Sequence, residues 1–387
     1  MAPGELAARS AEAAPHLRSR ARGVVSLKIA ILGTRGVPPR YGGFETFAAE
    51  LGTRLVARGH EVTVYCRDGG EGAVWLGIRR IVLPAIRHKY LETVSHTFLS
   101  ALNALRRDFD VILLCNAANA FVLPLLRAAR LPVAINVDGI ERRRRKWNLL
   151  GRAWYAIGES FAVRFANRII ADAEVIARYY RERYGADPVT IAYGADFPPE
   201  SDSDVLQRLR LRAQNYILYV SRFEPENNPL EVVLAYEKLD KAPPLVMVGA
   251  GLYAKDLVAE LQRHASDRIL FPGALYGVDY RTLQRNAMIY VQATEVGGTH
   301  PAMIEAMASG GCVLALDTAE NREVGGDSVG YFSLRPGETL SGAIREWLGD
   351  APKREMMRKS ARSRAAERYR WDQVTAAYEN LLSELVR

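Results

Sequence analysis

The sequence has few cysteines and no long apolar segment. Its 387 residues include only Cys66, Cys115 and Cys312. An odd, widely spaced set gives neither a disulfide framework nor the ligand spacing of a zinc site, so we expect buried, reduced thiols in a cytoplasmic protein. No uninterrupted apolar run approaches the ~20 residues that a membrane span needs. Residues 1–26 are rich in Ala and Arg but lack the apolar segment of a secretory signal, and we expect a disordered tail.

Signatures of nucleic-acid recognition are absent as well. The net charge is +8 and the pI is near 9.4, which suits nucleic acid, an anionic membrane surface or phosphorylated small molecules as partners. The chain has no RNA-recognition motif, zinc finger or basic zipper, so we expect no nucleic-acid partner. Its densest basic run, Arg142 to Lys146, precedes Trp147 and fits a basic face resting on the inner surface of the plasma membrane. A solvated basic turn is the alternative.

Apolar, strand-like runs alternate with helical patterns along two stretches of the chain. The protein is too long for one ordinary core, and residues 198–204, which contain only Pro, Glu, Ser and Asp, separate the stretches. We expect an α/β protein in which two Rossmann-like domains with doubly wound parallel sheets, residues 27–197 and 205–370, face each other across a cleft. Residues 371–387 should form a helix that packs back on the first domain. The expected strands are 27–32, 61–66, 80–83, 111–114, 132–137, 168–170, 189–191, 216–220, 245–248, 268–271, 288–291 and 311–315.

A glycine-rich loop, residues 33–43, follows the first expected strand. Strand, loop, helix and second strand within about 40 residues form a Rossmann-type opening. The loop is too long for the G-x-G-x-x-G fingerprint of dinucleotide binding. The acidic residue that would hold a ribose is missing at the end of the second strand, where Cys66-Arg67 stands instead. NAD is therefore disfavoured, and the arginines and paired glycines of the loop suit a diphosphate-sugar and its acceptor.

The stretch from Thr294 to Gly310 gives the clearest sign of a ligand. An apolar strand leads through a Gly-Gly turn into a helix that we expect to begin near Pro301. The free N–H groups and the positive dipole end of such a helix bind anions. Two carboxylates, Glu295 and Glu305, flank this site. The combination predicts a nucleotide-sugar, with its diphosphate at the helix end and a carboxylate on sugar or ribose hydroxyls.

Several spaced motifs resemble the family-4 retaining glycosyltransferases, which have the GT-B fold, and the resemblance covers nearly the whole chain from Leu27. It implies sugar transfer in cell-surface polysaccharide synthesis, with dTDP-L-rhamnose as donor, a lipid-linked saccharide as acceptor, and neither a metal nor another cofactor. The segments that look like the bacterial rhamnosyltransferase subgroup are Gly33-Thr34-Arg35-Gly36-Val37-Pro38, Tyr41-Gly42-Gly43-Phe44-Glu45-Thr46, Val137-Asp138-Gly139-Ile140-Glu141, Arg222-Phe223-Glu224-Pro225-Glu226-Asn227-Asn228 and Glu295-Val296-Gly297-Gly298-Thr299-His300-Pro301.

The resemblance also implies roles for single residues. Arg222 matches the family's diphosphate-binding Arg, whereas the position of its Lys partner falls on Asn227. The family carries two glutamates eight positions apart. Glu305 matches the second, which touches the donor ribose, while the first falls on Gly297. The expected donor-binding residues are Gly42, Gly43, Arg222, Asn227, Glu295, Gly297, Gly298, Thr299, His300 and Glu305.

The remaining candidates concern the reaction and the acceptor. Asp138 follows the carboxyl end of a strand, where open α/β sheets place ligands, and Glu226 stands near the expected sugar. The expected catalytic residues are Asp138, Glu226 and Arg222, and the expected acceptor-binding residues are Arg35, Arg40, Tyr41 and Glu141. The D-x-D strings at residues 108–110 and 202–204 open a strand and lie in the linker, so we expect no metal site.

Each of these residues also has a purely structural interpretation. Glu305 would be a helix first-turn carboxylate, Arg222 a surface ion-pair partner and Asp138 a turn former. Glu226 would cap a helix, and His300 would serve as a structural hydrogen bonder.

Three other functions remain open at this point. The same fold would use UDP-N-acetylglucosamine or UDP-glucose. A nucleotide-sugar epimerase also pairs Rossmann-like domains. A non-catalytic sugar-nucleotide-binding or membrane scaffold protein would fit the departures at Asn227 and Gly297.

Overall fold

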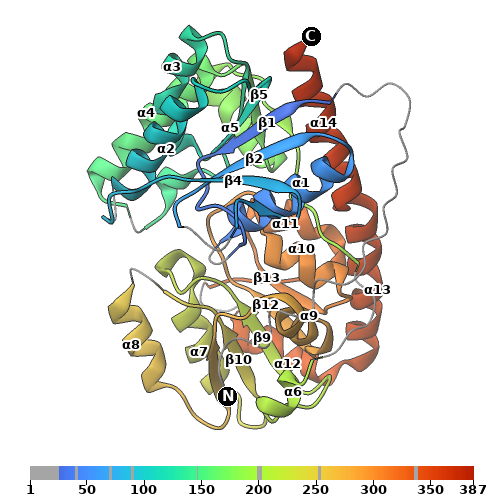
Figure 1. The fold of residues 1–387 in the computed structure, drawn as a ribbon. Coiled ribbons are helices and arrows are strands. Elements are labelled where there is room, and N and C mark those ends of the chain that lie inside the picture. The colour runs from blue at the N-terminus through green and yellow to red at the C-terminus, as the bar shows by residue number, and fades with distance from the viewer. Residues whose placement is uncertain are drawn as a thin grey trace.

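The computed structural model describes residues 26–39, 42–68, 72–88, 91–145, 147–197, 203–251, 254–334 and 339–387. Most of the expected tail and linker lies outside these ranges. Figure 1 shows two α/β halves, one above the other, each organised around its own sheet. The predicted pair of doubly wound, Rossmann-like units is confirmed.

The N-terminal half contains an eight-stranded sheet in the order β3-β4-β2-β1-β5-β6-β7-β8. Its central strands are continuous apolar runs because helices cover both faces of the sheet. All neighbours pair in parallel except β3 and β4, which form an antiparallel edge that the sequence analysis did not predict. The strands are β1 (Lys28–Leu32), β2 (Glu61–Cys66), β3 (Val74–Trp75), β4 (Ile78–Val82), β5 (Val111–Cys115), β6 (Val133–Asn136), β7 (Arg168–Ala171) and β8 (Val189–Thr190).

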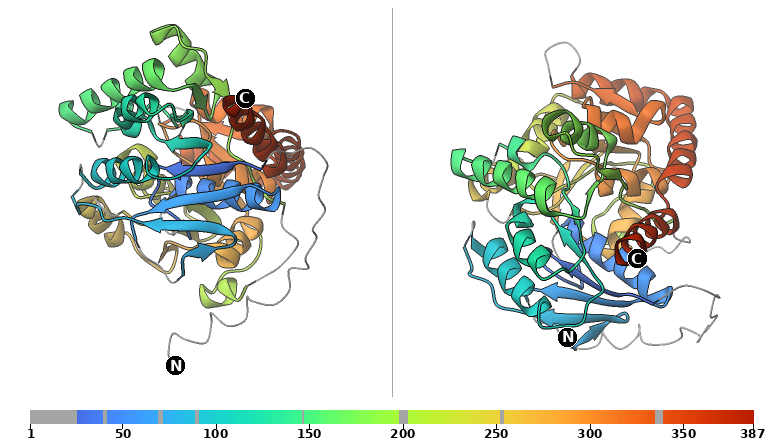
Figure 2. Two further views of the ribbon diagram at one scale, coloured as in Figure 1. Left: turned by 45° about the horizontal axis from the view of Figure 1, so that its top comes forward. Right: turned by 90° about the horizontal axis from the view of Figure 1, so that it is seen from above.

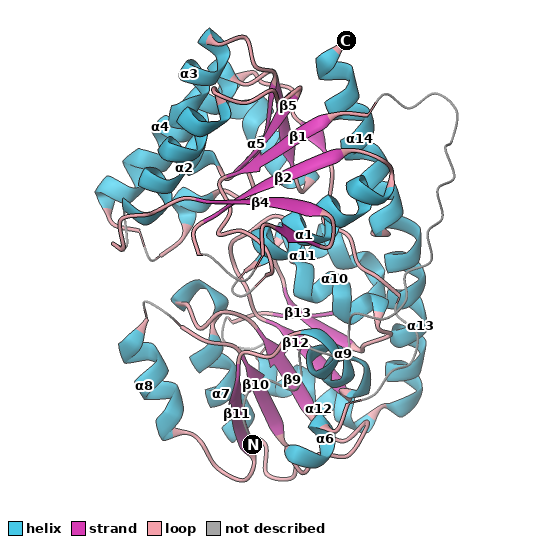
Figure 3. Ribbon diagram, viewed as in Figure 1, coloured by secondary structure: helices cyan, strands magenta, loops and turns pink. Residues whose placement is uncertain are grey.

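Helices cover the two faces of this sheet in separate layers (Figure 3). Apolar side chains of α1 and α14 pack on one face, and those of α2, α3, α4 and α5 pack on the other. The helical segments of this half are α1 (Gly43–Ala57), α2 (Leu91–Ala104), η1 (Ala117–Val122), α3 (Leu123–Ala128), η2 (Glu141–Arg143), α4 (Leu149–Phe165) and α5 (Glu174–Tyr184), where η denotes a 3₁₀ helix.

The C-terminal half contains a six-stranded parallel sheet in the order β11-β10-β9-β12-β13-β14. Helices α9, α10 and α13 cover one face, and α7, α8 and α12 cover the other. The edge strand β14 was not predicted. The strands are β9 (Ile217–Val220), β10 (Leu245–Val248), β11 (Ile269–Gly273), β12 (Ile289–Gln292), β13 (Val313–Leu316) and β14 (Gly330–Phe332).

The helical segments after residue 203 complete this half and add a return to the first. They are α6 (Val205–Arg208), η3 (Pro225–Asn227), α7 (Pro229–Glu237), α8 (Lys255–Arg263), α9 (Gly277–Asn286), α10 (Pro301–Ala308), α11 (Ala319–Gly325), η4 (Gly326–Ser328), α12 (Leu340–Gly349), α13 (Ala351–Arg368) and α14 (Trp371–Val386). Within the described ranges, none of the helices combines the length and the apolarity that crossing a membrane requires.

The last helix, α14, packs against the N-terminal half. The right-hand view of Figure 2 shows it, in dark red, beside the blue α1. The guanidinium of Arg58 lies 2.6 Å from the Glu379 carboxylate, and the amide of Asn136 donates a hydrogen bond of 2.8 Å to the buried Tyr378 hydroxyl. The C-terminal residues therefore complete the core of the first domain, which ties the two halves together.

Candidate functional site

One large cleft lies between the two halves. Its volume is about 1470 Å³, and the loops that follow the carboxyl ends of strands from both sheets line it. Of the predicted site residues that the structure describes, all line the cleft except Glu226 and Glu295. Arg40 and Tyr41 lie outside the described residues. The structure thus gathers the predicted residues of both halves around one space. It does not by itself assign their roles.

Two helix N-termini meet at this cleft. Helix α1 begins at Gly43 and α10 begins at Pro301. A Cβ atom on Gly43 would lie only 3.6 Å from Cγ of Pro301, so the two helix ends face each other across the halves. Arg222 follows β9 and lines the same space, close enough to Asp138 that its positive charge partly opposes the rise that burial causes in the pKa of that carboxyl. Two dipole ends and a guanidinium form a site suited to an anion.

Glu305 lies one turn into α10. Its Oε2 accepts a hydrogen bond of 2.5 Å from the Tyr280 hydroxyl, which in turn accepts one of 2.7 Å from the Gln284 amide. Burial raises the pKa of Glu305 to about 7, although the Tyr280 hydrogen bond opposes this shift. The carboxylate is therefore oriented by a polar chain, and its second oxygen can accept from a ligand hydroxyl.

The raised pKa of Glu305 predicts a specific pH dependence of stability. Because the folded state binds this proton more tightly than the unfolded state does, the free energy of unfolding should fall as pH rises from about 4.5 to 7. Between pH 5 and pH 8, the wild type should lose roughly 2–3 kcal/mol relative to Glu305→Gln, which carries no titrating group there. Urea unfolding of both proteins at the two pH values measures this difference. Parallel pH profiles would contradict it.

His300 lines the cleft and has one ring nitrogen without a partner among the described residues. The Asn321 amide nitrogen donates to the carbonyl groups of Leu316 and Thr294, so its oxygen faces Nδ1 of His300 at 2.9 Å. Nδ1 consequently carries the proton. Burial lowers the pKa of His300 to about 4, which keeps the ring neutral. Its Nε2, an acceptor in this tautomer, is buried beside Gly297 and has no hydrogen-bond partner among the described residues.

A buried charge cluster joins the halves at the wall of the cleft. The Arg144 guanidinium, 7% exposed, pairs with Glu141 in its own half and lies 3.4 Å from Glu226 in the other. Glu226 is fully buried, and its Oε2 has no partner in the described part of the chain. Asp138 completes the cluster in a left-handed backbone conformation, with φ of +59°. Burial and the nearby Glu141 raise the pKa of Asp138 to about 6.

The basic run thus has specific partners within the protein. Arg142 pairs with the buried Glu159 at 3.4 Å, and Arg144 lies in the charge cluster. Arg145 contacts both Glu295 carboxylate oxygens, at 2.5 and 2.7 Å, across the two halves. Lys146 lies outside the described residues. We predicted a basic face at this run, but three of its arginines form ion pairs, two of them between the halves.

Gly297 and Gly298 serve the contact between the halves. A Cβ atom on Gly298 would lie 1.8 Å from Oδ1 of Asp172, and a Cβ atom on Gly139 would lie 2.7 Å from the carbonyl carbon of Gly297. Asp172 follows β7, and its Oδ2 accepts a hydrogen bond of 2.9 Å from the Thr299 N–H. Burial raises the pKa of this carboxyl well above its usual value. The glycines let the two backbones approach, which the sequence analysis did not foresee.

Gly298→Ala should therefore loosen the interface. The new methyl group cannot coexist with the Asp172 carboxylate, and such overpacking costs about 1–3 kcal/mol. We expect a lower thermal-unfolding midpoint and a larger radius of gyration in small-angle scattering. Gly349→Ala is the control, since no atom lies within 4 Å of its new methyl position. Equal midpoints and radii for the two variants would contradict this role.

Two further predicted residues have structural contacts of their own. The Asn227 side-chain amide donates 2.7 Å to the Arg222 carbonyl group, so it shapes the loop that carries Arg222. Glu295 accepts from Asn228 as well as from Arg145. These contacts hold the loop after β9, although position 227 carries Asn where the motif resemblance implies Lys.

The sequence of each half matches a known glycosyltransferase family. Residues 41–196 match the family described as Glycosyltransferase Family 4, and residues 206–364 match Glycosyl transferases group 1. The chain belongs to the GT-B glycosyltransferases. The predicted fold is confirmed, while the rhamnosyltransferase subgroup and the retaining mechanism rest on motif resemblance alone.

Solved structures share this GT-B architecture. Sucrose-phosphate synthase from Thermosynechococcus elongatus is 19% identical, with a TM-score of 0.79 over 92% of this chain and 98% of that one. HepE of Anabaena, solved with UDP-glucose, is 20% identical, with a TM-score of 0.76 over 92% and 100%. The O-antigen chain mannosyltransferase B of Escherichia coli is 26% identical over 205 residues, which is 50% of this chain and about half the length of that protein.

Sequence reasoning missed several residues of this GT-B cleft and of the contact between the halves. Arg144 lay within a run interpreted as a surface, and Asp172 and Tyr280 belong to no motif. Glu323 of α11 accepts hydrogen bonds of 2.6 and 2.9 Å from the first two N–H groups of α5, and so caps a helix of the other half. The only available signal for Asp172 was its place near the carboxyl end of a strand, which it shares with Asp138.

Proposed function

We propose that this protein transfers a sugar from a nucleotide-sugar, bound in the cleft, to an acceptor hydroxyl. One observation carries the proposal: an anion site made by Arg222 and the α10 N-terminus shares the cleft with the oriented carboxylate of Glu305. A diphosphate fits the anion site, and a ribose fits beside the Glu305 carboxylate. HepE, which has the same fold, binds UDP-glucose.

The described residues suggest a division of roles. Charge on the departing diphosphate would be spread over Arg222 and the helix dipole, which takes the place of a metal ion in this proposal. Nε2 of His300 would accept from a hydroxyl of the donor sugar. Asp138, with a pKa of about 6, is largely ionised at neutral pH and can accept the proton of the acceptor hydroxyl.

A retaining, front-face reaction fits this arrangement. Glu226 was expected to be catalytic, but it is fully buried beside Arg144 and does not line the cleft. It is therefore poorly placed to attack a sugar. We assign it to positioning Arg144 and the loop after β9, and we propose direct attack by the acceptor without a covalent intermediate.

The acceptor in this proposal is a lipid-linked saccharide at the inner membrane surface. Helix α4 begins with Leu149 and Leu150, whose exposed fractions are 82% and 80%, and continues with the exposed Trp154 and Ile157. Leu150 and Trp154 also line the cleft. An apolar stripe that runs out of the cleft supports a lipid carrier. It also replaces the basic run as the candidate membrane contact.

Donor identity is tested by thermal stabilisation. dTDP-L-rhamnose is the first candidate on motif resemblance, and UDP-glucose the second because HepE binds it. A donor present at 100 times its dissociation constant should add about 2.7 kcal/mol to the free energy of unfolding. The panel contains both donors, UDP-N-acetylglucosamine, GDP-mannose and NAD.

Each result of the panel has a distinct meaning. A selective response to dTDP-L-rhamnose supports the first candidate, and a response to a UDP-sugar supports the second. Conversion of a bound donor to another sugar without acceptor would favour an epimerase. Binding without transfer or hydrolysis would favour a non-catalytic protein.

A further inference from the structure

A pair of arginines lies in the N-terminal half of the cleft, in a network that the proposed donor site does not use. Arg67 directly follows β2, and Arg35 lies in the loop after β1. Because β1 and β2 are parallel neighbours, their carboxyl ends meet at the same edge of the sheet. The Arg67 N–H donates 2.9 Å to the Arg35 carbonyl group, which fixes the two backbones side by side.

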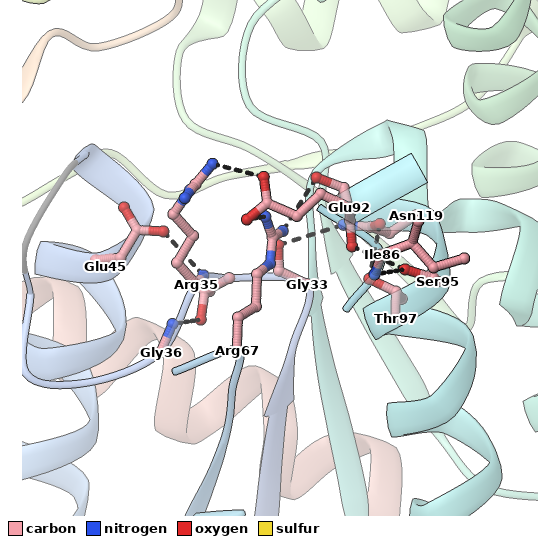
Figure 4. A network of polar contacts seen from close by, with 12 residues as sticks. Gly33, Arg35, Gly36, Glu45, Arg67, Ile86, Glu92, Ser95, Thr97 and Asn119 are labelled. Carbon is pink, nitrogen blue, oxygen red and sulfur yellow. Dashed lines mark hydrogen bonds and ion pairs between the residues drawn. The ribbon is translucent and has the colours of Figure 1, made fainter. Parts of the chain in front are cut away.

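The two guanidinium groups share one carboxylate. Nη2 of Arg35 lies 3.0 Å from Oε2 of Glu92, and Nη1 of Arg67 lies 3.6 Å from Oε1 of the same residue. Nη2 of Arg67 donates 3.0 Å to the Thr93 hydroxyl. Glu45 is the second carboxylate nearby, and its Oε1 accepts from the Arg35 N–H at 2.9 Å. Figure 4 shows how Arg35 from the β1 loop, Arg67 from the end of β2 and Glu92 from α2 converge, with Glu45 of α1 beside Arg35.

Arg67 is unusual in this network because it is buried and incompletely bonded. Its side chain is only 7% exposed, yet its Nε has no hydrogen-bond partner among the described residues. Its separation of 3.6 Å from Glu92 exceeds normal hydrogen-bond length. Burial and the like charge of Arg35 lower the pKa of Arg67, as expected where a charge is incompletely compensated. Buried guanidinium groups normally satisfy their donors, so this one suits a ligand.

The cleft extends to this network in the N-terminal half, whereas Arg222 belongs to the C-terminal half. Arg35, Arg67 and Glu92 all line it, as do residues of the first turn of α2. The positive end of this 14-residue helix adds to the attraction for an anion. The cleft volume of about 1470 Å³ exceeds the roughly 300–1,000 Å³ of an ordinary ligand site, which leaves room for a second ligand beside a donor.

We infer that Arg67 and Arg35 form an acceptor subsite that binds a phosphate or diphosphate group. Planar guanidinium groups bind phosphate oxygens in pairs. The anion would replace Glu92 in its weak contact with Arg67 and would accept a hydrogen bond from the unpartnered Nε of Arg67. The Thr93 hydroxyl would supply a further donor. This inference rests on the proposed function, because it assigns the acceptor to the N-terminal side of the donor cleft. The phosphate would come from a lipid carrier or from a free sugar phosphate.

Calorimetric titration tests the subsite with two probes, inorganic pyrophosphate and farnesyl diphosphate. UDP and dTDP are present in excess to fill the donor end. Arg67→Gln should weaken both probes by about ten- to a hundredfold, since it removes charge-assisted hydrogen bonds. Glu92→Gln should strengthen them severalfold, because it removes the competing carboxylate. Effects of opposite sign in two neighbouring residues cannot come from misfolding alone. Arg281→Gln is the control, because it removes a cleft arginine of the C-terminal half that the proposed donor site does not use, and it should leave both probes unaffected.

The outcomes separate this inference from the proposed function. If the two probes bind with equal affinity, the site recognises the phosphate groups alone, and a free sugar phosphate can fill it. If farnesyl diphosphate binds more tightly than pyrophosphate, the ligand is a lipid carrier. If the protein binds pyrophosphate through Arg67 but binds none of the nucleotide-sugars, the subsite is supported and the proposed function is contradicted. Loss of nucleotide binding in Arg67→Gln would place Arg67 at the donor and overturn the inference. So would probe binding that neither Arg67→Gln nor Glu92→Gln changes.

Discussion

Arg222→Gln is expected to lower kcat by roughly 10²–10³-fold with the donor that the thermal panel identifies. In the proposed reaction, negative charge grows on the diphosphate as the sugar–phosphate bond breaks. Removing one preorganised donor to such a charge costs an enzyme about this factor. Arg222 has no ion pair within the described part of the chain, so its charge is available to the ligand. Its loop is held by Asn227, which leaves the backbone intact in the variant.

Steady-state kinetics separates this role from simple donor binding. If Arg222 acts mainly in the transition state, kcat and kcat/KM fall together, whereas loss of ground-state binding raises KM alone. Arg281→Gln is the matched control, because Arg281 also lines the cleft but is exposed on α9. It should change kcat by less than about threefold. If Arg222→Gln is as active as this control, charge stabilisation must come from other cleft residues.

Strand and helix positions could be predicted because they depend on local sequence. The apolar runs that became β1, β5 and β12 are buried on both faces, and the predicted α10 begins at its proline. The edge strands β3 and β14 were missed because they contain two and three residues, too few to show a period.

For the site, the loops that line the cleft could be predicted from the sequence. Loops at the carboxyl ends of parallel strands meet wherever the sheets face each other, so Asp138, Arg222 and Glu305 come together. The partner of each side chain was not predictable. Arg144 meets a carboxylate 82 positions away, and Gly298 meets Asp172 from the other half. Such pairs depend on how the halves dock, and no local pattern encodes that.

Arg144→Met is expected to cost about 3–5 kcal/mol of folding stability, the largest stability effect among these variants. The substitution would leave Glu226 fully buried and Glu141 nearly so, without their shared cation. Breaking a buried ion pair from one side costs this much because the remaining charge loses its compensation. Urea unfolding at neutral pH measures the loss. The double variant Arg144→Met/Glu226→Gln should recover part of this lost stability, because one of the two uncompensated carboxylates is then absent.

Arg145→Gln provides the matched comparison. Arg145 also reaches across the halves, to Glu295, but its side chain is 54% exposed. Solvent screens such a pair, so its loss should cost less than about 1 kcal/mol. The two adjacent arginines bridge the same halves and differ mainly in burial. A similar loss in both variants would mean that docking of the halves, and not burial of charge, sets the stability of this interface. A large loss for Arg144 alone would show that the first domain's Arg144 is the obligatory counter-ion of the second domain's Glu226.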